Sequence, residues 1–398
     1  MHLFAAWTKD QGAPAPVVLC VDHALRQESA VEAARVQRWA KSTRLAAHIL
    51  RATGKKPKTG LEAHARNIRY RLMGDWCRAH GICALFVAHT LEDQAETFLL
   101  RLARGSGVDG LSAMQARAPF PDPNYRQIVL YRPLLDMCRS ELRAFLASRR
   151  QPWIEDPMNE DVRFARTRVR ALFPVLEAAG LPAGRIVGAA NHLARAREAL
   201  EVSAASLMTW AVHFDAAGYA VVDATALTEA PREIGLRALA AILLAISGNP
   251  YRPRFERLEH LYDAIAKRGL SGGRTLHGCR VAPAPKLFRS FGERTLLVSR
   301  EPREAVRAPD VLLTPGNAPV WDGRFKLTLA AESGIGRVRV AALGDQPALA
   351  EQLSHIPPPA RAGLPGLWRG RALLAAPHAA PGGTPGLMIE FLSHDTLR

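Results

Sequence analysis

Short apolar runs alternate with longer amphipathic stretches through the first part of the chain. Residues 17–21 are apolar and mostly β-branched and end at the polar Asp22, which is the pattern of a buried parallel strand. Residues 28–42 then carry apolar side chains at helical spacing, and residues 45–50 again have the pattern of a short strand. The pattern therefore predicts a strand, a helix and a second strand.

A longer helix and a third strand follow. Apolar residues recur at intervals of three and four over residues 61–79, and Thr59 and Glu62 have the spacing of a capping box at the start. A third strand is expected over residues 84–88, and another capped helix begins after His89. Strands and helices that alternate with short connections predict an α/β fold, in which a parallel sheet has helices on both faces.

After Pro174 the pattern changes. Residues 181–245 are rich in Ala, Leu and Arg at helical spacing, and the first evident strand comes at about residues 219–222. From about Pro302 the chain is rich in Pro and Gly and has only short apolar stretches. Three domains are therefore expected: an α/β domain over residues 1–178, a mainly helical domain over residues 179–301, and a small mixed or β-rich C-terminal domain over residues 302–398.

The chain has a strong net positive charge. The 398-residue sequence has 53 Lys and Arg against 37 Asp and Glu, a formal net charge of +16, and an isoelectric point near 10.3. Such a charge favours a polyanionic partner, with nucleic acid as the first candidate. The longest apolar run, residues 238–246, is less than half of the roughly 20 residues that a membrane-spanning helix needs, so no membrane partner is expected.

Neither the start of the chain nor its cysteines follow a targeting or metal-binding pattern. Residues 1–7 lack the basic region, apolar core and cleavage site of a signal peptide, which predicts a cytoplasmic protein. The five cysteines, at positions 20, 77, 83, 138 and 279, are scattered and include no Cys-x-x-Cys pair. We interpret them as reduced core residues, and no metal site is predicted from them.

Two carboxylates lie at the start of the helix that follows the third strand. His89, Asp93 and Glu96 are spaced i, i+4 and i+7, so they share one helix face at the carboxyl edge of the sheet. Neither acid has a cation four residues further on, so the two repel each other unless the fold or a ligand supplies positive charge; a free amine would fit. The alternative is a capped helix start, with Thr90 and Asp93 as a capping box, but Glu96 lies past the first turn.

Further polar residues lie at another strand end and on the long helix. Asp22 and His23 follow the first strand, and open parallel sheets bind ligands outside such carboxyl ends. Asp22 could equally make a local hydrogen bond in an ordinary turn. Arg66 and Arg69 are one helical turn apart and lie away from the apolar face. They could bind phosphate groups there, or they could be ordinary solvated residues of the helix surface.

A basic segment ends the first part of the chain. Residues 153–170 have four arginines in their last eight positions, after an acidic turn. A helix could place Arg163, Arg166 and Arg170 along one stripe, suited to an RNA backbone or a nucleotide phosphate. The alternative is internal pairing of these arginines with the acids at positions 155, 156, 160 and 161.

Taken together and in order, six motifs resemble those of the tRNA(Ile)-lysidine synthase family, within the PP-loop ATP pyrophosphatase superfamily. They are Val-Asp-His-x-Leu-Arg, Glu-x-x-Ala-Arg-x-x-Arg-Tyr, Ala-His-x-x-x-Asp-Gln-Ala-Glu-Thr, Arg-Gly-Ser-Gly, Arg-Pro-Leu-Leu and a segment from Glu-Asp-Pro-x-Asn to Arg-x-Arg. The resemblance spans roughly residues 17–174, continues weakly at residues 251–254 and 275–279, and is thin beyond residue 301.

The resemblance implies an ATP-dependent ligase that acts on tRNA. Members of the family use ATP, with Mg2+, to adenylate the wobble cytidine of a minor isoleucine tRNA. They then join the ε-amine of L-lysine to C2 of that base to form lysidine, releasing AMP and pyrophosphate. Residues 1–178 would be the PP-loop catalytic domain, and residues 179–301 a tRNA-binding or connecting domain.

By motif position, the resemblance also implies roles for single residues. Asp93 and Glu96 would hold the lysine amine, with His89 and Arg69 as the other catalytic residues. The remaining assignments are Asp22, His23 and Arg66 for ATP, and Arg163, Arg166 and Arg170 for RNA.

One motif of the family is not found. Its members open with a strand followed by Ser-Gly-Gly-x-Asp-Ser, whose backbone amides hold the ATP pyrophosphate, and no such pattern precedes Asp22. The Ser-Gly-Gly-Arg-Thr at residues 271–275 lacks Asp-Ser and follows no apolar strand. Residues 1–7 resemble the middle of the helix that normally follows the loop.

This difference leaves two hypotheses, an enzyme whose start lies further upstream and a non-catalytic relic that still binds tRNA. Translation of the DNA upstream of Met1 would separate them, because only the first requires an in-frame strand and loop there. Residues 1–398 alone are expected to bind ATP weakly and to form no lysidine, since scattered arginines must replace the amide cradle. A sheet without one central strand would also expose unpaired edges.

Overall fold

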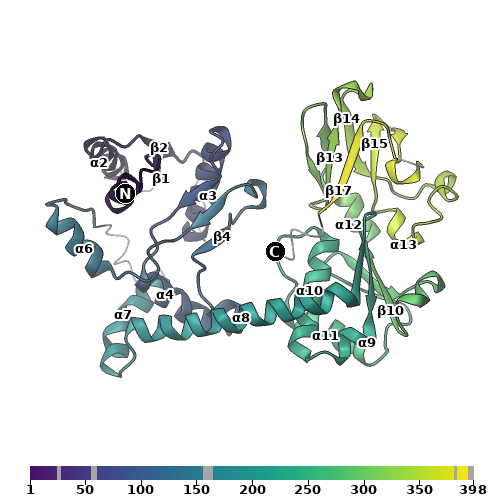
Figure 1. The fold of residues 1–398 in the computed structure, drawn as a ribbon, viewed down its shortest axis with the longest axis horizontal. Coiled ribbons are helices and arrows are strands. Elements are labelled where there is room, and N and C mark those ends of the chain that lie inside the picture. The colour runs from purple at the N-terminus through teal and green to yellow at the C-terminus, as the bar shows by residue number, and fades with distance from the viewer. Residues whose placement is uncertain (25–27, 55–60, 156–164, 381–382, 393–398) are drawn as a thin grey trace. The chain divides into compact units, whose positions relative to one another are not determined.

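The computed structural model describes residues 1–24, 28–54, 61–155, 165–380 and 383–392 of the chain (Figure 1). The chain divides into two compact units, Met1–Arg197 and Glu198–Arg398, and the boundary falls inside the long helix α8 (Ala183–Ala211). The division into three domains at residues 178 and 301 stays a prediction.

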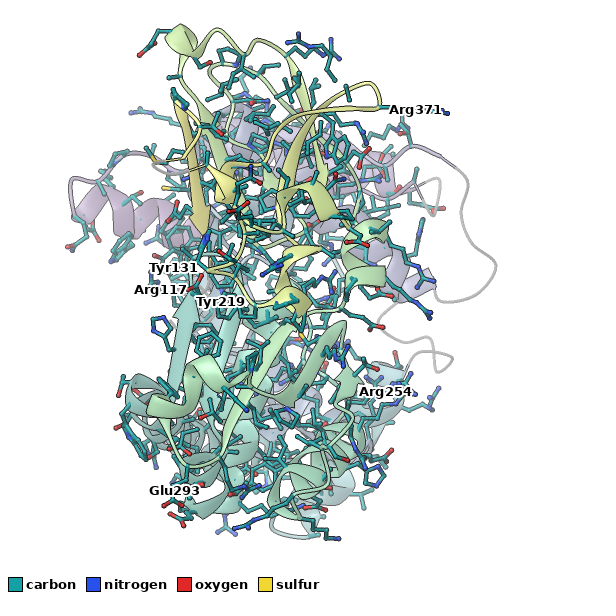
Figure 2. All side chains as sticks on the ribbon, turned by 90° about the vertical axis from the view of Figure 1, so that its right-hand side faces the viewer. Arg117, Tyr131, Tyr219, Arg254, Glu293 and Arg371 are labelled. Carbon is teal, nitrogen blue, oxygen red and sulfur yellow. The ribbon has the colours of Figure 1, made fainter. Side chains whose placement is uncertain are left out.

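Short strands form two separate sheets in the first unit. Their bounds are β1 (Val18–Asp22), β2 (Ala47–Arg51), β3 (Ala84–Phe86), β4 (Arg117–Pro119) and β5 (Val129–Tyr131). β1 pairs in parallel with β2, and β3 pairs in parallel with β5, while β4 joins β5 in antiparallel orientation. Arg117 and Tyr131, both labelled in Figure 2, are cross-strand partners in that last pair. The three strands predicted from the pattern are present.

Helices connect and flank these strands (Figure 1). Besides α8 they are α1 (His2–Asp10), α2 (Glu28–Ser42), α3 (Leu61–Ala79), α4 (Leu91–Leu102), α5 (Val108–Leu111), α6 (Arg139–Ser148) and α7 (Ala165–Ala178), with a short 3-10 turn, η1 (Pro123–Tyr125). α2 is the crossover between the parallel strands β1 and β2, and α3 leads from β2 to β3 of the other sheet; both coincide with predicted helices. The predicted cap of α3 at Thr59 lies outside the described residues. The α/β fold of this part of the chain is confirmed.

The core of the first unit lies between α3 and the sheet of β3 and β5. Tyr70, Met73 and Cys77 of α3 pack with Leu85 and Leu130 of the strands. Burial of this apolar stripe is what holds the amphipathic helix in place. A smaller cluster packs α4 against α8 through Ala95, Ile186 and Val187, and so holds α4 in place.

The second unit has a five-stranded antiparallel sheet in the order β6-β7-β10-β9-β8. Its elements are β6 (Val212–Asp215), β7 (Tyr219–Asp223), α9 (Ala224–Glu229), α10 (Arg232–Ser247), α11 (Phe255–Ala266), β8 (Arg274–Leu276), β9 (Cys279–Pro283), η3 (Lys286–Phe291) and β10 (Thr295–Arg300). The helices predicted over residues 181–245 are present. The structure adds a sheet to them: β8, β9 and β10 pair with their neighbours along the chain, and β10 also pairs with β7, which lies far away in the sequence.

Two further sheets make up the rest of the second unit, in the orders β11-β14-β15-β16 and β12-β13-β17. Their strands are β11 (Val311–Leu313), β12 (Val320–Trp321), β13 (Phe325–Leu329), β14 (Val338–Ala342), β15 (Pro365–Arg369), β16 (Ala372–Ala375) and β17 (Leu387–Phe391). The helical pieces are α12 (Pro302–Arg307), η4 (Ala331–Ser333), η5 (Pro347–Leu349), α13 (Pro358–Arg361) and η6 (Pro377–Ala379). The mixed, β-rich character predicted beyond Pro302 is confirmed.

The long apolar run at residues 238–246 lies in α10, which is buried along almost its whole length between α11, α9 and the sheet. No single helix in the described part of the chain is long and apolar enough to cross a membrane. By length and composition, only the pair α7 and α8, bent by 102°, meets that requirement jointly.

Candidate functional site

The site begins at the end of β3, where the chain turns into α4. Thr90 caps the helix, and Asp93 completes a capping box by accepting a hydrogen bond from the Thr90 backbone N–H, 2.9 Å from Oδ2. The predicted cap is therefore confirmed. It uses only one oxygen of Asp93, and Oδ1 is left to bind a cation.

Glu96 lies one turn further along α4 and is fully buried, with no exposed surface. A buried carboxylate is costly unless it is paired and hydrogen-bonded. Arg170 of α7 supplies the pair: its Nε lies 2.5 Å from Glu96 Oε1 and its Nη2 lies 3.3 Å from Oε2. The fold thus provides one of the positive charges that the sequence of α4 lacks.

Arg139, at the first position of α6, supplies the other positive charge. Its Nη2 lies 2.7 Å from Asp93 Oδ1 and 3.4 Å from Glu96 Oε1, and its backbone N–H donates to Glu92 Oε1 at 2.9 Å. Our sequence analysis did not identify Arg139. A signal was available, since a cation in the first turn of a helix opposes the helix dipole and needs acids elsewhere.

We call Glu92, Asp93, Glu96, Arg139 and Arg170 the acid cluster. Its three carboxylates and two guanidinium groups leave a formal net charge of −1. Glu92 Oε2 is buried and has no hydrogen-bond partner among the described residues. The acid cluster therefore has one more carboxylate than guanidinium groups and an unused acceptor, so an ammonium group that took the place of one arginine could pair with its anions.

The pKa of Asp93 is lowered in this setting. Burial alone would raise it, but the hydrogen bond from the Thr90 backbone and the Arg139 guanidinium outweigh the burial. Asp93 is consequently ionised at neutral pH and can act as an anion toward a ligand.

His89 lies beside the acid cluster and is neutral. Burial lowers its pKa to about 4, Asp93 opposes that shift, and Arg132, Arg66 and Arg166 add to it. Its Nδ1 is buried without a hydrogen-bond partner among the described residues. His89 therefore adds no positive charge that would repel a bound amine at neutral pH.

Asp22 and His23 form a second group at the end of β1. Asp22 is buried and accepts hydrogen bonds from the Ala24 backbone at 2.8 Å and the Ser29 hydroxyl at 2.7 Å, so the local turn considered from the sequence is present. His23 accepts a hydrogen bond at Nε2 from Arg69 Nε, 3.3 Å away. Burial and Arg69 lower the pKa of His23, although Asp22 opposes them.

The arginines of α3 link the two groups. Arg69 contacts His23, whereas Arg66, one turn earlier, lies over the ring of Tyr70 at 5.0 Å and is near enough to influence His89. Both arginines are exposed. Their surface position leaves them accessible to a phosphate group.

The basic segment is described only in part, and Arg163 lies outside the described residues. Arg166 of α7 is close enough to His89 to influence its pKa, and Arg170 joins the acid cluster. In the part of the chain that the structure describes, Glu155 pairs instead with Arg143, at 2.6 Å. The structure therefore brings Asp93, Glu96, His89, Arg166 and Arg170 together around the start of α4.

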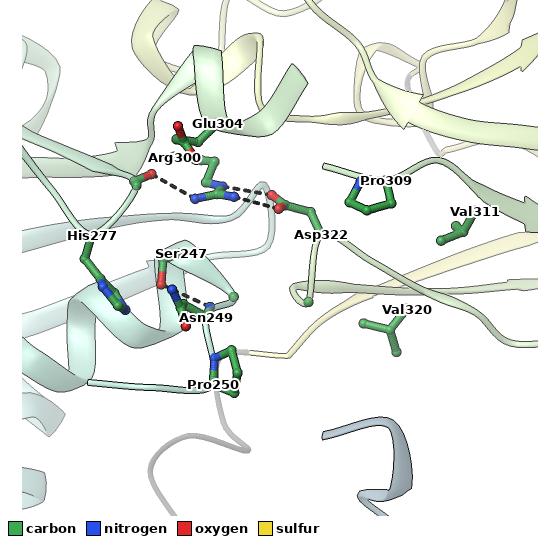
Figure 3. A pocket seen from close by; sticks show the side chains of 13 residues that line it. Ser247, Asn249, Pro250, His277, Arg300, Glu304, Pro309, Val311, Val320 and Asp322 are labelled. Carbon is green, nitrogen blue, oxygen red and sulfur yellow. Dashed lines mark hydrogen bonds and ion pairs between the residues drawn. The ribbon is translucent and has the colours of Figure 1, made fainter. Parts of the chain in front are cut away.

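A separate cavity of about 630 Å³ lies within the second unit (Figure 3). His277 and Asn249 line one side of it, and the ion pair of Arg300 and Asp322 lines the other. Gly278 has a positive φ of +74°, and a Cβ there would lie 2.2 Å from Arg300 Nη1. The close approach of that guanidinium therefore requires glycine.

Comparisons with known proteins identify the family of this chain. A family model described as PP-loop domain matches residues 1–176. A tRNA(Ile)-lysidine synthase of Wolbachia pipientis wMel is 34% identical over 84% of this chain and 74% of its own length. That of Ruegeria pomeroyi is 33% identical over 95% of this chain and 85% of its own. That of Methylobacterium nodulans is 42% identical over 66% of this chain and 79% of its own. The chain belongs to the tRNA(Ile)-lysidine synthase family.

Proposed function

We propose that this protein uses ATP to ligate L-lysine to the wobble cytidine of a minor isoleucine tRNA, through an adenylated cytidine. The observation that carries the proposal is the acid cluster, which has one more carboxylate than guanidinium groups and a Glu92 oxygen with no hydrogen-bond partner among the described residues; both suit the ammonium group of lysine. The names of the relatives and the six sequence motifs support the same reaction.

The proposed reaction has two steps. In the first, O2 of the cytidine attacks the α-phosphate of ATP and pyrophosphate leaves. In the second, the ε-amine of lysine, after losing a proton, attacks C2 and AMP leaves. Asp93 and Glu96 would hold the ammonium form and so bring the amine to the reacting carbon, which is the contribution of proximity and orientation.

The described residues fit the nucleotide in part. Exposed Arg66 and Arg69 could bind phosphate oxygens, and His23 lies at the strand end where such sheets bind ligands. Among the described residues, no group of three or more His, Cys, Asp and Glu side chains could hold a metal ion. We infer that Mg2+ would enter with the phosphates of ATP, as is usual for this ion.

We infer that the second unit contributes to tRNA binding. Several basic side chains are exposed on the elements around its cavity: Arg252, Arg254, Arg257, Arg274 and Arg280. Figure 2 labels Arg254. The exposed aromatic rings of Tyr251 and Phe255 lie in the same stretch of chain. Arginines with interleaved aromatics can bind a phosphate backbone and stack on bases.

The experiment that tests the proposed reaction measures incorporation of radioactive lysine into an isoleucine tRNA transcript with a CAU anticodon. The protein is assayed as residues 1–398 and with any in-frame residues encoded upstream of Met1. We expect incorporation that requires both ATP and tRNA. No incorporation by the extended chain, although it binds that tRNA, would contradict the proposal.

The alternative is a non-catalytic relic that binds tRNA. L-lysine binding measured by calorimetry separates the two, because it needs neither ATP nor the loop. A relic under no constraint to keep the amine site should bind tRNA but no lysine. The enzyme should bind both.

A further inference from the structure

One nitrogen of Arg139 lies between the two carboxylates of the proposed lysine site. Nη2 is 2.7 Å from Asp93 Oδ1 and 3.4 Å from Glu96 Oε1. An ammonium group that bridged the same two carboxylates would need the same position, because both cations seek the same oxygens. The guanidinium and the lysine ammonium therefore cannot occupy the cluster in this arrangement together.

Arg139 is the arginine that can leave more readily. In the described part of the chain it reaches the carboxylates through Nη2 alone, and its side chain is 35% exposed. Arg170 binds Glu96 through two nitrogens and is 25% exposed. Bidentate pairing is the stronger of the two arrangements. Glu96 would thus keep Arg170 when Arg139 is displaced.

The backbone of Arg139 is held by contacts that do not involve its side chain. Its N–H donates to Glu92 Oε1, and the Cys138–Glu141 capping box begins α6 at this residue. The guanidinium can therefore swing on its flexible stem from a held backbone position. A displaced guanidinium at this place would need a new anion nearby.

We propose that Arg139 is a specificity-determining residue that changes its carboxylate partner when lysine binds. It leaves Asp93 and Glu96 as the ε-ammonium enters, and it then binds the α-carboxylate of the same lysine. This inference rests on the proposed function. A diamine with the same ammonium but no carboxylate would have to displace Arg139 with no compensating contact.

The test compares the dissociation constants of L-lysine and 1,5-diaminopentane by calorimetry, without ATP or tRNA. The wild-type chain should prefer lysine by roughly tenfold to a hundredfold, the value of one charge-assisted hydrogen bond. In Arg139→Gln, lysine should bind more weakly relative to the diamine, so that the preference falls to about threefold or less. Arg139→Lys keeps a cation without the planar fork and should give an intermediate preference.

Arg143→Gln is the matched control, because Arg143 lies on the same helix, is exposed and pairs with Glu155 away from the cluster. It should leave the preference unchanged. An unchanged preference in both Arg139 variants, with lysine still bound, would overturn the exchange and leave the lysine site intact. A wild-type chain that binds neither compound would overturn the lysine site, and the exchange with it.

Discussion

Each unit of the protein contains one buried cluster of arginines and carboxylates, and the two clusters differ in how completely their groups are paired. In the second unit, Asp322 lies between Arg300 and Arg324, and we call these three residues the core ion cluster. All three side chains are nearly inaccessible to solvent. The acid cluster of the first unit is partly open, through Arg139 and Arg170.

The core ion cluster leaves no carboxylate oxygen unpaired. Arg300 binds Asp322 through two nitrogens at 2.8 and 3.0 Å, and Arg324 binds it at 2.7 Å. Other arginine nitrogens donate to backbone carbonyls, including that of Gly363 at 2.7 Å from Arg324. These bonds join the end of β10 to the turn between β12 and β13 and to the loop before β15. We interpret this cluster as structural.

The acid cluster, unlike the core ion cluster, contains groups that are not fully paired. It has more carboxylates than arginines, one buried oxygen without a described partner, and a neutral histidine beside it. A protein that needed Glu96 only for stability would gain by satisfying these groups. Incomplete pairing of the charged groups, rather than their burial as such, therefore distinguishes the proposed ligand site from the core ion cluster.

The largest expected effect is on stability, from the core ion cluster. Asp322→Ala leaves two buried guanidinium groups unpaired and should lower the free energy of unfolding of the second unit by about 3–5 kcal/mol. Scanning calorimetry measures this as a lower transition temperature. Asp310→Ala, which removes an exposed pair with Arg339, is the control and should cost about 1 kcal/mol or less. A loss from Asp322→Ala as small as that of the control would refute the structural role.

The next largest effect is expected from a substitution in the acid cluster, and it concerns the affinity for L-lysine. Glu96→Gln should weaken L-lysine binding by about 2–5 kcal/mol, roughly thirtyfold to several thousandfold, because the ammonium loses a desolvated anion. Calorimetric titration measures the change. Glu177→Gln, an exposed acid of α7, should have no effect. Unchanged lysine affinity in Glu96→Gln would remove Glu96 from the proposed site.

Asp93→Ala sharpens the same comparison, because Asp93 both caps α4 and pairs with Arg139. Loss of the cap alone should cost about 0.5–2 kcal/mol of stability and leave lysine affinity unchanged. We expect both stability and lysine affinity to fall. Urea unfolding and calorimetric titration of the same variant measure the two effects. A fall in stability without a fall in affinity would make Asp93 a capping residue only.

A smaller effect is expected on the salt dependence of tRNA binding. Each phosphate contact contributes about −0.7 to −0.9 to the slope of log affinity against log salt. Arg254→Gln and Arg274→Gln should each reduce that slope by about this amount. Arg307→Gln, which removes an exposed side chain paired with Glu304, should leave it unchanged. Filter binding over a salt series measures the slopes, and slopes equal to wild type in both variants would exclude these arginines from the RNA surface.

The smallest effect should be that of pH on lysine binding. Lowering the pH from 7.5 to 5.5 would protonate a histidine of ordinary pKa, and the new charge would repel the ammonium. The pKa of His89 is about 4 because of its burial, and the lowered pKa of Asp93 keeps that carboxylate ionised. Affinity should therefore stay flat over this range and fall only as the pH approaches 4. A severalfold fall near pH 6.5 that is absent in His89→Asn would contradict the neutral histidine.

The sequence by itself determined the local features of this protein. The spacings that predict these features span only a few residues. They place the strand ends, the helices α2 and α3, and the capping box of Thr90 and Asp93, which side-chain periodicity and backbone hydrogen bonding fix directly. The shared face of His89, Asp93 and Glu96 was predictable for the same reason. The family motifs supplied the expected reaction.

Only the tertiary structure decided which cations meet these acids. The sequence left open whether the fold or a ligand supplies the positive charge, and the fold supplies Arg139, 43 residues from Glu96, and Arg170, 74 residues from it. Likewise, β8, β9 and β10 follow one another along the chain, but they join the rest of the sheet through the pairing of β10 with β7. That pairing is set by packing between distant segments, which no local spacing encodes.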